Sequence, residues 1–176
     1  RFRHATDHGY AAPVRYRDCP TAEATARIAT DEASAWAAVT DIALPTRTSP
    51  ELRAVRWLDG ATSPTVGARF EGDNANDALG EWTTTCTVTE VEPGRRWVYD
   101  VGTAEGTWST WGFEVEPASD GVIVRQWMRM GPARSGLSIA IDAMPDKEAR
   151  IVARRLDEHR RAMQSTLDRL KADLEG

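Results

Sequence analysis

The sequence predicts an α+β domain in which a curved antiparallel sheet of seven strands packs against one long C-terminal helix. Between residues 51 and 130, stretches that alternate apolar and polar residues are separated by turn sequences such as Asp59-Gly60. Helical patterns lie outside this run, and residues 145–175 carry an apolar stripe with helical spacing. Strands grouped apart from helices are typical of the α+β class, and a curled sheet offers its concave face to such a helix.

Composition limits the classes of function. The chain has 176 residues, a length suited to one domain, with 41% hydrophobic residues, 28% charged residues and a mean hydropathy of −0.48. A net charge of −5 and a pI near 5.3 argue against nucleic acid as the main partner. No apolar run is long enough to insert into a membrane. The two cysteines, Cys19 and Cys86, match no metal spacing, which favours a reduced cytoplasmic location.

The N-terminal part of the chain is predicted to consist of an extension and the first strand. Residues 1–20 are polar and read as an extension, with a short strand at 14–17. Residues 21–29 alternate, which predicts a half-buried strand. Its inner face carries unusually small side chains, namely Ala22, Ala24 and Ala26, followed by Ile28. Small inward-facing side chains leave space in the core. That space is either filled by side chains from the opposite side or stays open.

A helix is predicted to follow the first strand. Thr30 offers an N-cap hydroxyl, and Asp31 and Glu32 place carboxylates at the positive end of the helix dipole. The helix ends before Pro45, and residues 45–50 form a tight connection with one helical turn.

Six further strands and two helices complete the prediction. The strands are expected at 51–58, 66–73, 81–91, 96–102, 107–116 and 122–130, with a polar loop at 74–80. A short helix is expected at 135–144, before the long helix of residues 145–175. The stripe of the long helix consists of Val152, Leu156, Met163, Leu167, Leu170 and Leu174. His159 falls within this stripe and should therefore point inward.

Four stretches of the sequence resemble one known family. They are DEASAWAAVTDI, SPELRAVRWLDGATSPTVGARF, WTTTCTVTEVEPGRRWVYDV and WGFEVEP. They are similar to the SRPBCC (START-like, polyketide cyclase/dehydrase) superfamily, and the C-terminal segment is similar to its actinobacterial members in particular. The resemblance covers residues 21–174 and implies the helix-grip fold, a seven-stranded antiparallel sheet wrapped around the C-terminal helix with a cavity between them. It implies no catalytic motif that can be carried over to this chain.

The candidate site residues are those expected on the inward faces around that cavity. Aromatic rings there suit a flat hydrophobic ligand, but they serve equally as core packing. The predicted ligand-binding residues are Phe70, Asn74, Trp82, Thr84, Trp97, Tyr99, Ser109, Trp111, Phe113, Gln126, Met128, Leu156, His159 and Met163. His159 is the candidate acid/base, working with Tyr99 or a bound water, and the alternative for His159 is a histidine that only fills the core. No metal site or cofactor is predicted.

Three functions remain open from the sequence. The first is a single ligand-binding domain over residues 21–176 that encloses a small hydrophobic ligand, aromatic, polyketide-like or lipid. The second is a polyketide cyclase or aromatase that uses His159 as acid/base. The third is a stress or toxin–antitoxin type partner protein in which the cavity is incidental. A homodimer is one option for assembly, whereas nucleic acid binding and membrane insertion are not expected.

Overall fold

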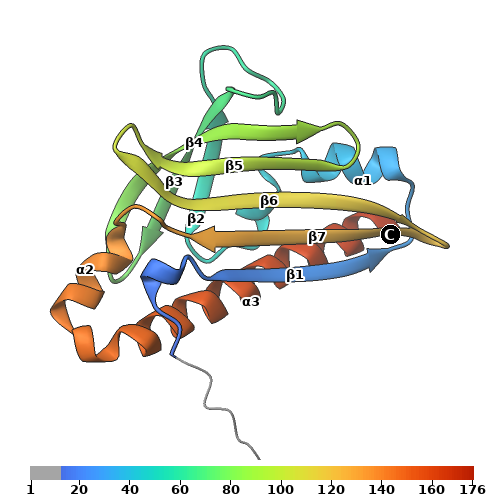
Figure 1. The fold of residues 1–176 in the computed structure, drawn as a ribbon. Helices are drawn as coiled ribbons and strands as arrows, with labels where there is room; N and C mark the ends of the chain where they lie inside the picture. The colour runs from blue at the N-terminus through green and yellow to red at the C-terminus, as the bar shows by residue number, and fades with distance from the viewer. Residues whose placement is uncertain (1–12) are drawn as a thin grey trace, which may run out of the picture.

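The computed structural model describes residues 13–176, which form one antiparallel sheet of seven strands with helices on its concave side (Figure 1). The strands are β1 (Thr21–Ile28), β2 (Leu52–Trp57), β3 (Arg69–Asn76), β4 (Gly80–Glu92), β5 (Arg96–Thr103), β6 (Gly106–Ala118) and β7 (Gly121–Met130). The helices are α1 (Glu32–Val39), α2 (Gly136–Ala143) and α3 (Glu148–Glu175), with 3-10 turns η1 (Tyr16–Asp18), η2 (Leu44–Arg47) and η3 (Pro145–Lys147). The predicted α+β fold class, with its long C-terminal helix, is confirmed.

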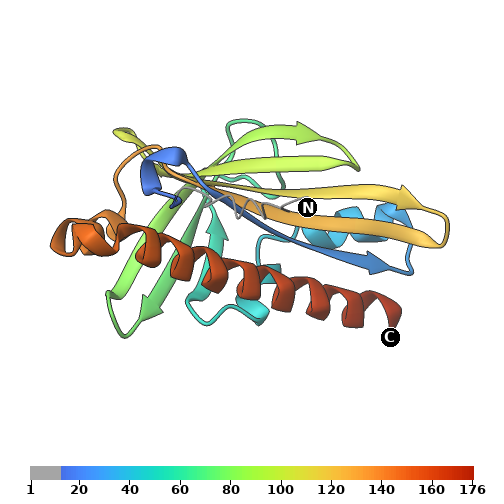
Figure 2. The same ribbon diagram turned by 60° about the horizontal axis from the view of Figure 1, so that its bottom comes forward.

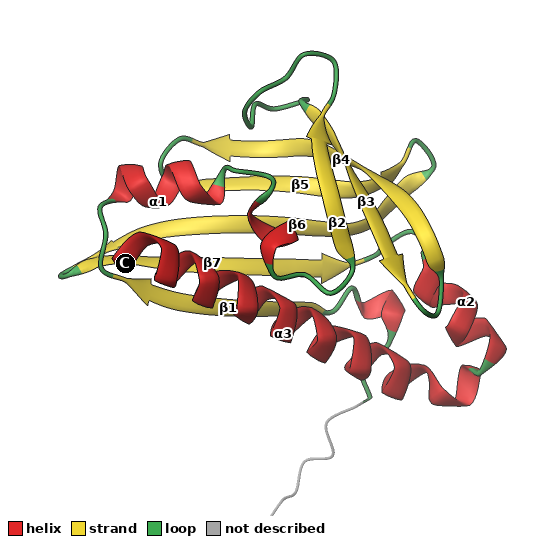
Figure 3. Cartoon of the chain, turned by 180° about the vertical axis from the view of Figure 1, so that it is seen from behind, coloured by secondary structure: helices red, strands yellow, loops and turns green. Residues whose placement is uncertain are grey.

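Strands β2 to β7 form a meander, and β1 is the edge strand next to β7. The strand order is β1-β7-β6-β5-β4-β3-β2, so consecutive strands from β2 to β7 are neighbours and β1 pairs with β7. Short turns join consecutive strands from β3 to β7, whereas the connection from β1 to β2 carries α1 and η2 from one edge of the sheet to the other. Figure 2 shows α3 running along the concave side of the curled sheet, and Figure 3 shows α1 and α3 on that same side.

The small inner face of β1 is where α3 packs. Ala22 and Ala24 are buried, so the helix approaches the strand closely. From α3, the buried residues Val152, Met163 and Leu167 pack into the same core. Each fully buried side chain of this size contributes roughly 1.5–3 kcal/mol relative to its exposed state. The room left by the small residues of β1 is therefore filled by the helix.

Three local predictions were wrong. The strand expected at 14–17 is replaced by the 3-10 turn at Tyr16–Asp18. The helix cap is Asp31 instead of Thr30, because the Asp31 carboxylate accepts a hydrogen bond from the Ser34 amide at 2.8 Å. The loop expected at 74–80 begins later, since β3 continues through Asn76 and pairs with β4. Polar residues near a hairpin can remain in the ladder when backbone partners are available, which alternation alone does not reveal.

The convex face of the sheet carries charged and polar side chains around one tryptophan. Trp127 lies on this face, as its alternation with buried neighbours predicts. Its ring covers Gly112, where an added Cβ would lie 2.6 Å from the ring. Arg96 stacks over the ring at 5.3 Å, and the indole N–H donates to Glu114 at 3.1 Å. Within residues 13–176, no helix combines the length and apolar character needed to cross a membrane.

Candidate functional site

The concave face of the central strands brings together most of the predicted site residues. The strand register places Tyr99, Trp111 and Met128 directly opposite one another on β5, β6 and β7. A second row holds Trp97, Phe113 and Gln126. Alternate residues of a strand share a face, so the two rows lie side by side beneath α3.

One half of this surface is packed core. Trp97 stacks on Phe113 and on Tyr99, with ring centroids 6.0 Å and 5.1 Å apart, and Phe70 meets Tyr99 edge-on at 5.0 Å. The Trp97 indole N–H donates to the Val39 carbonyl of α1 at 3.0 Å. Trp97 is only 2% exposed. A buried ring that stacks on two aromatic neighbours and donates a hydrogen bond to a helix end packs as part of the core.

The other half remains partly open around Trp111. Its ring meets His159 of α3 edge-on with centroids 5.1 Å apart, and its indole N–H donates to the Ser109 hydroxyl at 3.0 Å. Trp111, His159 and Leu156 are each half-buried, in contrast to the fully buried Met163 one turn further along α3. The open part of the concave face thus lies between β6 and the N-terminal half of α3.

His159 is a neutral imidazole at physiological pH. Burial, and to a lesser extent the nearby Arg155 cation, lowers the pKa of His159 to about 4, although the carboxylates of Glu51 and Glu158 act in the opposite direction. Within the described part of the chain, neither ring nitrogen has a hydrogen-bond partner that stabilises one protonation state. A neutral, partner-free imidazole can accept or donate a hydrogen bond to a bound molecule.

An ion pair beside His159 was not predicted from the sequence. Arg155 donates two hydrogen bonds to the Glu51 carboxylate, each 2.8 Å long, and a third to Glu158 at 3.1 Å. Asn76 donates to Glu51 at 3.0 Å. The hydrogen bonds from Arg155 hold the pKa of Glu51 below its usual value. Arg155 precedes His159 by one helical turn, a spacing that could have identified it, whereas Glu51 is brought there only by the tertiary fold.

One buried polar atom on the concave face, the side-chain oxygen of Gln126, lacks a partner among residues 13–176. Gln126 is 4% exposed, and its side-chain oxygen has no hydrogen-bond donor within residues 13–176. Burial strongly raises the pKa of Tyr99, so its hydroxyl remains protonated, and no hydrogen bond offsets this shift among the described residues. Leaving a buried polar atom unpaired costs about 1–3 kcal/mol. Such groups are typical of sites that receive a polar atom from a ligand.

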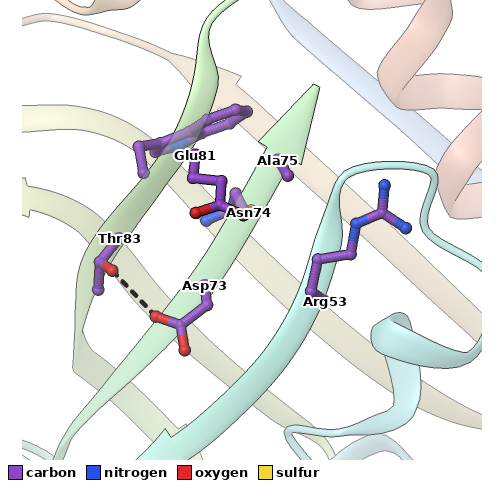
Figure 4. Close-up of a pocket in the computed structure, with 7 residues that line it drawn as sticks. Arg53, Asp73, Asn74, Ala75, Glu81 and Thr83 are labelled. Carbon is purple, nitrogen blue, oxygen red and sulfur yellow. Dashed lines mark hydrogen bonds between the residues drawn. The ribbon is translucent and has the colours of Figure 1, made fainter. Parts of the chain in front are cut away.

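Asn74, Trp82 and Thr84 lie apart from this centre, near the β3–β4 hairpin. Asn74 pairs with Trp82 across the ladder and donates to the Thr84 hydroxyl at 3.3 Å. Asn74 and Trp82 also border a hollow of about 510 Å³, whose other lining residues are Arg53, Asp73, Ala75, Glu81 and Thr83 (Figure 4). Most of these alternate with Asn74 and Trp82 and therefore belong to the convex face.

A second hollow, of about 470 Å³, also lies on the convex face, where Thr85, Thr87 and Asp100 contribute to its lining. Neither hollow lies between the sheet and α3. The rings of the central strands occupy much of the space there, whereas the side chains of Trp111, Leu156 and His159 are only half-buried.

Comparisons with known proteins identify related folds. Residues 20–175 match the family described as polyketide cyclase/dehydrase and lipid transport. The Polyketide_cyc-like protein Cgl2372 from Corynebacterium glutamicum is similar in structure, with a TM-score of 0.64, 25% identity and 93% of each chain covered. Among curated proteins, none matches the chain.

Two further structures share the fold. The di-domain ARO/CYC protein BexL from the BE-7585A biosynthetic pathway has a TM-score of 0.64 and 19% identity, over 89% of this chain and 50% of BexL. Protein CV1439 from Chromobacterium violaceum has a TM-score of 0.58 and 19% identity, over 89% of this chain and 98% of CV1439.

Proposed function

Because the chain belongs to the polyketide cyclase/dehydrase and lipid transport family, we propose that it binds a small hydrophobic ligand, aromatic or polyketide-like, between the concave face and α3. The ligand's ring system would lie against Trp111 and Leu156. Its polar atoms would meet the side chains of Gln126, Tyr99 and His159. Met163 and the buried rings behind Trp111 would form the floor of the site.

The unpaired amide oxygen of Gln126 is the observation that carries this proposal. A fully apolar side chain at this core position would avoid the cost of burying an amide. Gln126 lies between Phe113 and Ala24 in the strand register, so apolar residues surround it on both sides. A ligand with a hydroxyl or N–H group would satisfy the oxygen while its rings bury apolar surface.

Binding can be tested with the fluorescent probe N-phenyl-1-naphthylamine, which has an apolar ring system and one N–H donor. We expect saturable binding of one probe per chain, measured by fluorescence titration and native mass spectrometry. Trp111→Ala should weaken binding about tenfold, since a buried aromatic contact is worth on the order of 1.4 kcal/mol. Trp127→Phe, on the convex face, is the matched control and should bind as the wild type does. Absence of saturable binding would contradict the proposal and favour a protein partner instead.

Replacing Gln126 with leucine should separate stability from binding. Leucine has a similar size and no unpaired polar atom, so the free energy of unfolding is expected to rise by about 1–2 kcal/mol. The same change should weaken binding of N-phenyl-1-naphthylamine but not of 1-benzylnaphthalene, which carries CH₂ in place of N–H. Urea denaturation and competition titrations measure the two effects. A less stable variant with unchanged selectivity would show that the Gln126 amide has a structural role.

A cyclase or aromatase activity is the second candidate, and the neutral imidazole of His159 favours it. A neutral histidine can take a proton from an acidic C–H between two carbonyl groups, and the protonated Tyr99 hydroxyl can hydrogen-bond the oxygen that gains charge. A synthetic poly-β-keto thioester is a suitable test substrate. His159→Gln and Tyr99→Phe should each slow formation of the cyclised product at saturating substrate while N-phenyl-1-naphthylamine still binds. Equal rates in all three proteins would exclude this role for both residues.

A further inference from the structure

Tyr16 contacts both ends of the segment that contains α2. Its hydroxyl oxygen lies 2.8 Å from the Ala133 carbonyl and 3.1 Å from the Ser135 hydroxyl, just before α2 begins. Its backbone N–H donates to Glu148, the first residue of α3, at 3.0 Å. Arg15 adds an ion pair with the other oxygen of the same carboxylate at 2.8 Å. Residues 136–147 therefore form a loop-like segment whose two ends are joined through one residue.

Few side chains of the segment between these ends are buried. Of the residues in α2, only Ser138 is buried, and Ile139 and Met144 are 68% and 42% exposed. Leu137 and Ile141 are the side chains that turn toward the core. Segments with few buried contacts open locally at low free-energy cost.

This segment lies at the end of the concave face where the site is open. In Figures 1 and 3, α2 lies between the start of α3 and the β3–β4 end of the sheet. Gly136 adjoins Leu79 of the β3–β4 turn, since a Cβ on Gly136 would lie 3.7 Å from Leu79 Cδ1. The Leu79 amide in turn donates to Asn76, which binds Glu51 beside Arg155. The α2 segment is thus next to the polar end of the proposed site.

We propose that Tyr16 is a clasp that holds the α2 segment closed over this end of the site, and that its release allows a ligand to enter. The entry role rests on the proposed ligand-binding function. Tyr16 precedes the first residue of the family match, residue 20, whereas the groups that it contacts lie within the matched region. An opening of this segment would widen access to the half-buried side chains at this end of the site, since neither of the two hollows described above leads between the sheet and α3.

Hydrogen exchange of the full chain tests the clasp without a ligand. Tyr16→Phe removes the hydroxyl and keeps the ring, and the amides of residues 137–147 are then expected to exchange about 3- to 10-fold faster. Glu148→Gln, which weakens the anchor at the start of α3, should have the same local effect. Thr48→Val is the control, since it removes a hydrogen bond to Thr166 elsewhere on α3. Unchanged exchange in residues 137–147, or equal acceleration throughout β1 and β7, would overturn the clasp.

Stopped-flow binding of N-phenyl-1-naphthylamine tests the entry role. Releasing the clasp should change how fast the probe enters and leaves the site more than how tightly it binds. Tyr16→Phe should therefore raise the association and dissociation rate constants together, by about 3- to 10-fold. The dissociation constant should change by less than about twofold. Binding with unchanged rate constants contradicts the entry role alone and leaves the proposed function standing. Failure of wild type and variant to bind the probe contradicts both.

Discussion

Replacing Trp97 with alanine is expected to lower the free energy of unfolding by about 3–5 kcal/mol, the range for deleting a large buried aromatic ring. Trp97 stacks against Phe113 and Tyr99 and donates a hydrogen bond to the Val39 carbonyl. The deletion leaves a cavity that the surrounding strands cannot close, because each neighbour is held in the sheet. Chemical denaturation monitored by circular dichroism measures the change.

Two variants show whether the loss comes from packing at this position. Trp97→Phe keeps an aromatic ring but loses the hydrogen bond to Val39, so a loss of about 1–2 kcal/mol is expected. Trp82→Ala removes a half-buried indole near the β3–β4 hairpin and should cost less than half of the Trp97→Ala effect. If Trp97→Ala instead has little effect on stability and abolishes probe binding, Trp97 is a ligand contact and its assignment to the packed core is wrong.

Lowering the pH from 7.5 to 4.5 is expected to cost about 2–3 kcal/mol of stability through His159 alone. The pKa of His159 is lowered from 6.5 to about 4 in the folded protein. Below pH 6.5 the His159 side chain becomes protonated in the unfolded chain, whereas in the folded chain it stays neutral down to about pH 4. The unfolded state therefore gains protons first, and the stability is lost as the pH falls through this window.

His159→Gln isolates this contribution. Both proteins are denatured with urea at pH 7.5 and pH 4.5, and the stability lost between the two pH values is compared. His4 and His8, which lie outside the described residues, are present in both proteins and cancel in the comparison. The wild type should lose about 2–3 kcal/mol more than the variant. Equal losses would show that folding leaves the pKa of His159 unchanged, and a smaller loss in the wild type would show that the charged imidazole pairs with Glu51 or Glu158.

The fold could be predicted almost entirely from local patterns. Alternation in the strand regions and the stripe from Val152 to Leu174 identified the sheet and its covering helix, because side-chain period depends only on the backbone conformation. Boundaries were less accurate: β3 extends to Asn76, and Asp31 replaces Thr30 as the helix cap. Both errors concern polar residues whose hydrogen-bond partners decide between strand, loop and cap.

The candidate site could be predicted only in part. Alternation correctly put Trp97, Trp111 and Gln126 on one face, yet it could not separate rings that fill the core from rings beside open space. That distinction depends on what packs against each ring: α1 contacts Trp97, whereas the half-buried His159 meets Trp111.

The sequence by itself determined the fold class, the order of the elements and the inward position of His159, since these follow from periodicity along the chain. Only the tertiary structure decided the surroundings of that histidine. It brought Glu51 to Arg155 across 104 positions of sequence and joined Tyr16 to both ends of the α2 segment. Ion pairs, pKa shifts and unpaired polar atoms depend on distances in space, and no spacing along the chain encodes those distances.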